Sequence, residues 1–186
     1  MTVAGKESVD LPAGTLNSVL KHTGLKQAVR GPREADVIRI LQPNDLEPLV
    51  AFFEANNTPD TAKYFDPFPL DRQTAERIVA GDGNLYYVAE TTGVVRGFCM
   101  IRFWSGFEDA TTGLLVGYES RGRGLGVKLI AHVVTELQRL GKNCTAFIDL
   151  GNTASIRVVE HVGFEKVGER SKDGRRQGVY RYVCVS

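Results

Sequence analysis

The chain has 186 residues, of which 42% are hydrophobic and 24% are charged, and this composition excludes disorder, collagen and coiled coil as descriptions of the whole chain. Its 23 Lys and Arg balance 22 Asp and Glu to a net charge of +1, so bulk charge gives no reason to expect a nucleic acid or an anionic membrane as partner. No apolar run approaches the roughly 20 residues of a membrane span and the N-terminus has no apolar signal core, so we expect a cytoplasmic protein.

Residues 1–35 are rich in Gly, Pro, Ser and Thr, and we expect them to form an N-terminal extension, with one short helix between Thr15 and Gly24, before a single domain over 36–186. Alternating residues predict a strand over 37–41. Helix signals then follow from Pro43 to about Asn56 and from an Asp71 N-cap to Gly81. The segment between these helices, 58–71, is rich in proline and aromatic residues.

Further along the chain, two strands at 85–90 and 94–104 are joined by a Thr-Gly hairpin signal, and a third strand is predicted at 112–118. The clearest helix spans Leu125–Leu140, where apolar residues line one face and Gly141 follows the last turn. A short apolar strand at 144–150, a helix at 153–162 and strands near 164–167 and 179–185 complete the order. This order predicts an α/β protein with a mixed sheet.

Between the third strand and the clearest helix lies a glycine-rich stretch, RGRGLG, which predicts a phosphate-binding loop. Glycines allow the backbone to turn sharply and approach a ligand, and the free N–H groups of the following helix favour an anion. A P-loop would need Gly-Lys-Ser/Thr where Gly126, Val127 and Lys128 stand, and a dinucleotide fingerprint would need G-x-G-x-x-G after the first strand. A pyrophosphate loop of the form R-x-x-G-x-G remains, beside the alternative of a glycine-rich turn without a ligand.

This loop, followed by a long amphipathic helix, resembles the coenzyme-A loop of the GNAT superfamily of acyl-CoA-dependent N-acyltransferases. A second stretch, from Asn152 through a short helix to Gly163 and Phe164, resembles the later motif of the same superfamily. The resemblance covers residues 37–185 and excludes the extension. It implies a central, mostly antiparallel sheet with one parallel, splayed strand pair, flanked by about four helices.

The resemblance also implies acetyl-CoA as acyl donor, with the pantetheine arm entering the gap between the splayed strands and pairing with backbone as an added strand would. No metal is expected, because the chain has no Cys/His cluster. The residues expected to bind the cofactor are Leu114, Leu115, Val116, Arg121, Gly122, Arg123, Gly124, Leu125, Gly126, Asn152 and Ser155.

The catalytic groups are less clearly marked. Where many members of the superfamily carry an acid this chain has Thr111, so Glu108 and Asp109 are the candidate bases, unless both are solvated turn charges. The usual general acid is a Tyr at the position of Val159, and Ser155 is the nearest hydroxyl; His161 is expected on the surface. Cys99, Cys144 and Cys184 fall in apolar strands, which favours direct attack of the amine over a covalent intermediate.

The acceptor pocket is expected to contain an aromatic wall of Tyr64, Phe65, Phe68 and Trp104, with Asp60, Asp66 and Asp71 nearby; core packing is the alternative role for these rings. Carboxylates suit a cationic amine, so we expect a small-molecule primary amine, an amino sugar among the options. Two alternatives are a ribosomal-type protein N-terminal acetyltransferase and a non-catalytic acyl-CoA-binding module. The oligomeric state stays open, with a homodimer as one option.

Overall fold

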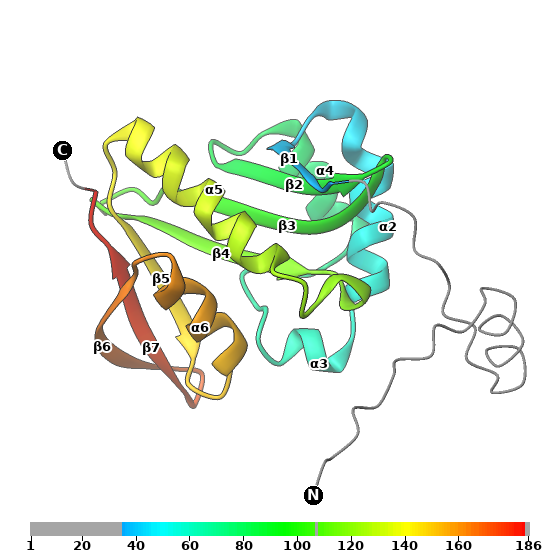
Figure 1. The fold of residues 1–186 in the computed structure, drawn as a ribbon. Helices are drawn as coiled ribbons and strands as arrows, with labels where there is room; N and C mark the ends of the chain where they lie inside the picture. The colour runs from blue at the N-terminus through cyan, green and yellow to red at the C-terminus, as the bar shows by residue number, and fades with distance from the viewer. Residues whose placement is uncertain (1–34, 107, 185–186) are drawn as a thin grey trace, which may run out of the picture. The chain divides into compact units, whose positions relative to one another are not determined.

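The computed structural model describes residues 35–106 and 108–184. The helix expected between Thr15 and Gly24, with nearly all of the expected extension over 1–35, lies outside the described residues. Within them the chain forms a seven-stranded sheet with helices on both faces (Figure 1).

The sheet is mixed and mostly antiparallel. Its order is β1-β2-β3-β4-β5-β7-β6, and each neighbouring pair is antiparallel except β4 and β5, which confirms the expected arrangement. The strands are β1 (Val37–Ile40), β2 (Leu85–Thr91), β3 (Val94–Arg102), β4 (Ala110–Val116), β5 (Cys144–Asp149), β6 (Glu165–Lys172) and β7 (Arg175–Tyr182).

Four helices of nine or more residues flank the sheet in the described part of the chain, as expected, and a four-residue helix, α3, is added to them. The helices are α2 (Leu46–Asn56), α3 (Pro59–Ala62), α4 (Arg72–Ala80), α5 (Leu125–Leu140) and α6 (Thr153–His161), with 3-10 turns η1 (Pro43–Asp45) and η2 (Tyr118–Ser120). The helix α5 ends at Leu140 and is capped by Gly141, whose φ of 62° is the left-handed conformation that glycine adopts without strain.

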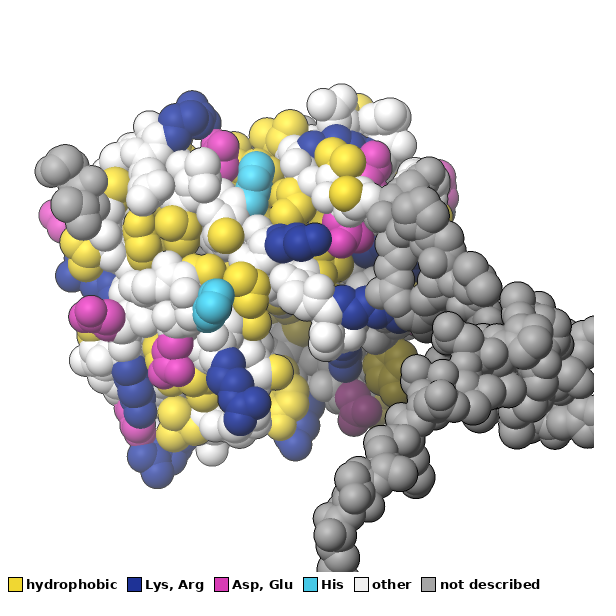
Figure 2. Space-filling view, in the orientation of Figure 1, with side chains coloured by type: hydrophobic (Ala, Val, Ile, Leu, Met, Phe, Trp, Pro, Cys, Tyr) yellow, Lys and Arg dark blue, Asp and Glu magenta, His cyan; other side chains and the backbone are white. Residues whose placement is uncertain are grey.

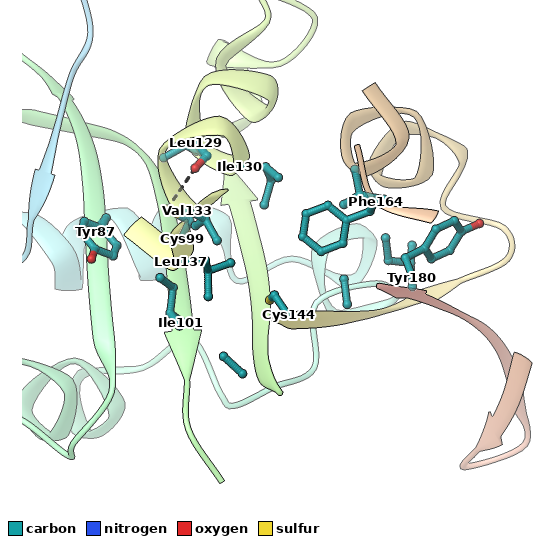
Figure 3. Packing of buried hydrophobic residues seen from close by; sticks show 14 of the residues in the cluster. Tyr87, Cys99, Ile101, Leu129, Ile130, Val133, Leu137, Cys144, Phe164 and Tyr180 are labelled. Carbon is teal, nitrogen blue, oxygen red and sulfur yellow. Dashed lines mark hydrogen bonds between the residues drawn. The ribbon is translucent and has the colours of Figure 1, made fainter. Parts of the chain in front are cut away.

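Strand β3 separates two hydrophobic clusters because its successive side chains point to opposite faces. Cys99 and Ile101 are buried under α5 in one cluster with Leu129 and Leu137 (Figure 3), whereas Phe98 and Met100 are buried against α2 and α4. Packing on both faces fixes β3, which in turn pairs with β4 through residue 116. The position of β4 is therefore set by core packing.

The parallel pair opens along its length. β4 and β5 have seven and six residues, yet they pair only at Ala110–Cys144 and Thr111–Thr145. Beyond that point β5 stays paired with β7 as far as Asp149. The edge of β4 from residue 112 to 116 therefore has no strand beside it on the β5 side, which confirms the splayed pair.

Some boundaries differ from the prediction. β4 begins at Ala110, two residues early, because that residue is buried and its N–H donates to the Asn143 carbonyl at 3.0 Å. The hairpin of β6 and β7 is longer than expected. Each residue of β6 is exposed, so no hydrophobic alternation marks the strand, and its pairing with β7 alone defines it.

The outer surface is mixed in character. On the face shown in Figure 2, Lys and Arg side chains are interspersed with Asp, Glu and apolar side chains. Among the helices described for residues 35–106 and 108–184, none is both long and apolar enough to cross a membrane. The feature of the fold that bears on function is the opening between β4 and β5.

Candidate functional site

A cleft of about 1430 Å³ occupies the opening between β4 and β5. The glycine loop and the start of α6 line it near the C-terminal end of β4, and the segment 58–71, the loop before β4 and the β6–β7 hairpin line the rest. It brings together most of the predicted site residues. Those that line it are Tyr64, Phe65, Trp104, Glu108, Asp109, Leu114, Leu115, Val116, Arg121, Gly122, Gly124, Leu125, Gly126, Asn152 and Ser155.

The glycine loop leaves the start of α5 open to a ligand. Gly122 and Gly124 have φ values of 70° and 79°, and no heavy atom lies within 4 Å of where a Cβ would stand on either residue. The N-cap, Gly124, provides no side-chain cap, and the first turn of α5 contains no acidic residue. The first N–H groups of a helix and its dipole favour a phosphate there.

Three cations lie in or just after this loop in the sequence, and their surroundings differ. The Arg121 guanidinium donates to the Val116 carbonyl at 3.3 Å and to Thr61 Oγ1 at 3.4 Å, so it ties the loop to α3. Lys128 lies 3.6 Å from a carboxylate oxygen of Asp36. Arg123 is exposed and does not line the cleft. Of the three, Arg121 is the one held at the cleft.

The start of α6 forms the opposite wall. Asn152 is its N-cap, and its Oδ1 accepts from the Ser155 N–H at 3.2 Å, which leaves the amide NH₂ as a donor for a ligand. Val159, at the position where the superfamily usually has Tyr, is buried in the cluster under α5 and also lines the cleft. His161 is exposed at the end of α6. The hydroxyl of Ser155 is thus the one that α6 brings to the cleft among its described residues.

The two candidate bases have different environments. Asp109 accepts two hydrogen bonds from Arg181, at 2.7 and 3.0 Å, and one from Thr145 Oγ1 at 3.2 Å. The Arg181 guanidinium lowers the pKa of the Asp109 carboxyl below its ordinary value, which makes that group a weak base. Glu108 lines the same cleft, is exposed, and has no hydrogen bond or ion pair to the described residues. This geometry favours Glu108 over Asp109 as the base.

Asp109→Asn is expected to reduce thermal stability at neutral pH and to have a smaller effect in acid. Because the folded-state pKa is lowered, the ion pair stabilises fully above the ordinary value of about 3.8, and this stabilisation is lost as pH falls through the folded-state value. Both partners are partly exposed, so we expect a drop in Tm of roughly 2 °C at pH 7. Thermal unfolding of both proteins from about pH 2 to 7 tests this, and an unchanging difference in Tm would contradict it.

The predicted aromatic wall is only partly at the cleft. Tyr64, Phe65 and Trp104 line it, and Trp104 Nε1 donates to Thr111 Oγ1 at 2.9 Å. Phe68 instead packs against Phe53, Phe65 and Phe98 in the cluster under α2. Of the three nearby acids, Asp60 and Asp66 line the cleft, and Asp71 is the N-cap of α4.

The cysteine thiols do not supply a nucleophile in this cleft. Cys99 and Cys144 are fully buried, and burial raises the pKa of both thiols, so neither forms a thiolate at neutral pH. Cys184 lies after the end of β7 and is partly exposed, not within a strand as predicted, and it does not line the cleft. The two buried thiols therefore give no support to a covalent intermediate, and direct attack of an amine stays a prediction. The described residues contain no group of three or more His, Cys, Asp or Glu placed to hold a metal ion.

Several lining residues carried no signal in the sequence. Arg102 on β3, Phe147 on β5, and Arg170 and Gln177 on the β6–β7 hairpin line the cleft. Arg170 stands in a run of charged residues that resembles a solvated face, and only strand pairing brings it to the site. Predicting the full length of the β6–β7 hairpin would have indicated that Arg170 and Gln177 are paired.

A family model described as the acetyltransferase (GNAT) family matches residues 49–164. An L-methionine sulfoximine/L-methionine sulfone acetyltransferase from Salmonella typhimurium is 31% identical over 96 residues, which are 49% of this chain and 56% of the relative. The L-amino acid N-acyltransferase MnaT of Escherichia coli is 28% identical over 96 residues, with the same two shares. These matches thus span about half the length of the curated relatives.

Solved structures share the fold. The yncA protein of Salmonella typhimurium, solved with its cofactor acetyl-CoA, has a TM-score of 0.69 at 22% identity and covers 81% of this chain and 95% of that one. A ribosomal-protein-S5-alanine acetyltransferase from Vibrio fischeri has a TM-score of 0.71 at 14% identity, with 83% and 96% covered. At these identities the likeness establishes the fold alone.

Proposed function

Since this chain belongs to the GNAT family of acetyltransferases, we propose that it transfers an acetyl group from acetyl-CoA to the primary amine of a small molecule. The observation that carries the proposal is the single cleft that joins an uncapped, glycine-rich helix start to a wall of aromatic and charged side chains. The first part suits a nucleotide diphosphate, and the second suits a polar acceptor.

The residues present fit coenzyme A. The unpaired edge of β4 from residue 112 to 116 offers backbone groups to the amides of a pantetheine arm, and Asn152 offers its side-chain NH₂ from the opposite wall. Gly122 and Gly124 leave open space where larger residues would have a side chain. When bound, acetyl-CoA supplies the thioester whose C–S bond breaks as the C–N bond forms.

Each proton in the transfer has a candidate group in this chain. Glu108 takes the proton that the attacking amine loses, directly or through a water. A backbone N–H at Leu115 or Val116 donates to the oxygen on which negative charge develops. The departing sulfur gains a proton from solvent or from Ser155, eased by the N-terminus of α6.

A small acceptor is favoured over a peptide because the segment 58–71 crosses to the far wall of the cleft. The Tyr64 hydroxyl donates to the Gly151 carbonyl at 3.4 Å, and Arg175 of β7 donates to the Lys63 carbonyl at 2.6 Å and to the Asp66 carboxylate. A peptide N-terminus needs an open groove, which these contacts narrow. The names of the curated relatives favour an L-amino acid as the acceptor, whereas the amino sugar stays an untested option.

The function is tested by mixing the purified protein with acetyl-CoA and single acceptors while free thiol is followed. The panel holds L-methionine sulfone, other L-amino acids, glucosamine and an N-terminal peptide of a ribosomal protein. We expect thiol release with an amino acid, confirmed by mass spectrometry of the N-acetyl product. Release with the peptide alone would favour the N-terminal acetyltransferase, and binding of acetyl-CoA without any release would favour the non-catalytic module.

The valine at the usual tyrosine position is expected to leave the enzyme active. The pKa of a thiol is about 8.5, so a thiolate leaves tolerably well at neutral pH, and a general acid adds only about 10²-fold at the low end of its range. Val159→Tyr should therefore raise kcat modestly, if the ring fits the buried position, and Ser155→Ala should cost less than about tenfold. Activity that appears only in Val159→Tyr would contradict this.

A further inference from the structure

The strongest unassigned feature of the cleft is the guanidinium of Arg170. It lies on the face of the Phe147 ring, with Cζ 3.4 Å from the ring centroid, and its Nε donates to Gln177 Oε1 at 2.9 Å. Among the described residues it has no ion pair with Asp or Glu, and its two terminal nitrogens have no hydrogen-bond acceptor. The guanidinium is therefore held in place, and its two terminal nitrogens are left to donate hydrogen bonds to a ligand.

The other cations of the hairpin near this end of the cleft each have a carboxylate partner. Arg175 and Lys172 both pair with Asp66, and Arg181 pairs with Asp109. Arg170 differs from them although it belongs to the same hairpin. Partial removal of the Arg170 guanidinium from water lowers its pKa, and the negative charge of Asp66 opposes this only in part.

The contacts of Arg170 follow from the sheet register. Arg170 is paired with Gln177, Gln177 with Asp149, and Phe147 with Val179, so the three side chains belong to neighbouring positions on β6, β7 and β5. Gln177 is buried, with 6% of its surface exposed. Its position is fixed because β7 pairs with β5 on one side and with β6 on the other. A stacked and hydrogen-bonded arginine loses little further side-chain entropy when it binds an anion.

We propose that Arg170 binds the carboxylate of the acceptor, so that the enzyme selects α-amino acids over amines without a carboxylate. The proposal rests on the proposed function. Two parallel N–H donors at one end of a guanidinium match the two oxygens of a carboxylate. A carboxylate bound there also supplies the ion-pair partner that Arg170 lacks among the described residues.

Arg102 is the rival for this role. Its guanidinium lies over Trp104, with Cζ 4.3 Å from the ring centroid, and its Nε is buried without a partner. It stands on β3, on the other side of β4 from the hairpin, and no side-chain hydrogen bond orients it in the described structure. Arg170 is favoured because Gln177 and Phe147 fix its plane.

The test uses two probes that differ only by the carboxylate: L-methionine sulfone and 3-(methylsulfonyl)propylamine. Trp104 is the single Trp of the chain and lines the cleft, so its fluorescence reports binding without turnover. We expect the wild type to bind the amino acid at least about tenfold more tightly than the amine. Arg170→Gln should remove this preference, raise KM for the amino acid about tenfold or more, and leave kcat and amine binding nearly unchanged. Arg170→Lys should recover part of the preference.

The matched control is Arg176→Gln on the same hairpin. Arg176 is exposed, pairs with Glu169 and does not line the cleft, so the preference should survive. Equal weakening of both probes by Arg170→Gln, or loss of the preference in Arg102→Gln alone, would overturn the assignment. A carboxylate preference that depends on Arg170 in a protein without turnover would support the assignment while removing the proposed function.

Discussion

Gly126→Glu is expected to abolish coenzyme-A binding while the domain stays folded. Gly126 is the second residue of α5, and a Cβ there would lie 3.4 Å from Val158 Cγ2 and 3.6 Å from Leu114 Cδ1, between α6 and β4. A glutamate therefore fills the opening and places its charge at the helix N-terminus, where the diphosphate is expected. Lost space and like-charge repulsion together should weaken binding by at least about 100-fold.

Gly126→Gln separates the two causes, because it adds nearly the same bulk without the charge. We expect binding intermediate between the wild type and Gly126→Glu. Calorimetric titration with coenzyme A measures the affinities, and circular dichroism with thermal unfolding verifies that each variant is folded. Unchanged affinity in folded Gly126→Glu would show that the loop does not hold the diphosphate.

The glycine loop and the starts of α5 and α6 could be predicted because their signals are local. The glycines, the helix start and the amphipathic face of α5 lie within one stretch of sequence, and Asn152 caps the helix that begins at the next residue. Helix capping and hydrophobic periodicity act over a few residues, so single-sequence patterns contain them. The splay of β4 from β5 came from the resemblance, since no residue pattern encodes it.

The acceptor end could not be predicted in the same detail because its contacts join distant parts of the chain. Arg175 reaches Asp66 across 109 positions, and Arg181 reaches Asp109 across 72. Phe68 has the same local composition as Phe65, yet only Phe65 lines the cleft, since the ring of Phe68 packs between Phe53 and Phe98. Tertiary packing decides which of these rings is buried, so the local sequence does not predict it.

The same long-range pairing separates the two candidate bases. Asp109 accepts hydrogen bonds from Arg181 and Thr145, and its lowered pKa keeps it ionised but makes it a weak base. Glu108, one residue earlier, lines the cleft and has no hydrogen bond or ion pair to the described residues. The sequence pattern did not distinguish Glu108 from Asp109 as the candidate base. The pairing of β7 with β5 distinguishes them, because it brings Arg181 to Asp109.

Glu108→Gln is accordingly expected to lower kcat by about 10²-fold or more, within the range for loss of a general base, with acetyl-CoA affinity unchanged. A reaction that depends on a general base has a rate that rises with pH, and this rising limb should flatten in the variant. Asp109→Asn is the matched control, and it should keep the rising limb because Asp109 is already paired with Arg181. Steady-state kinetics from about pH 5 to 9 with an amino-acid acceptor decides between them. If Asp109→Asn flattens the limb and Glu108→Gln does not, the assignment of the base is reversed; if neither does, the amine arrives deprotonated and this site needs no carboxylate base.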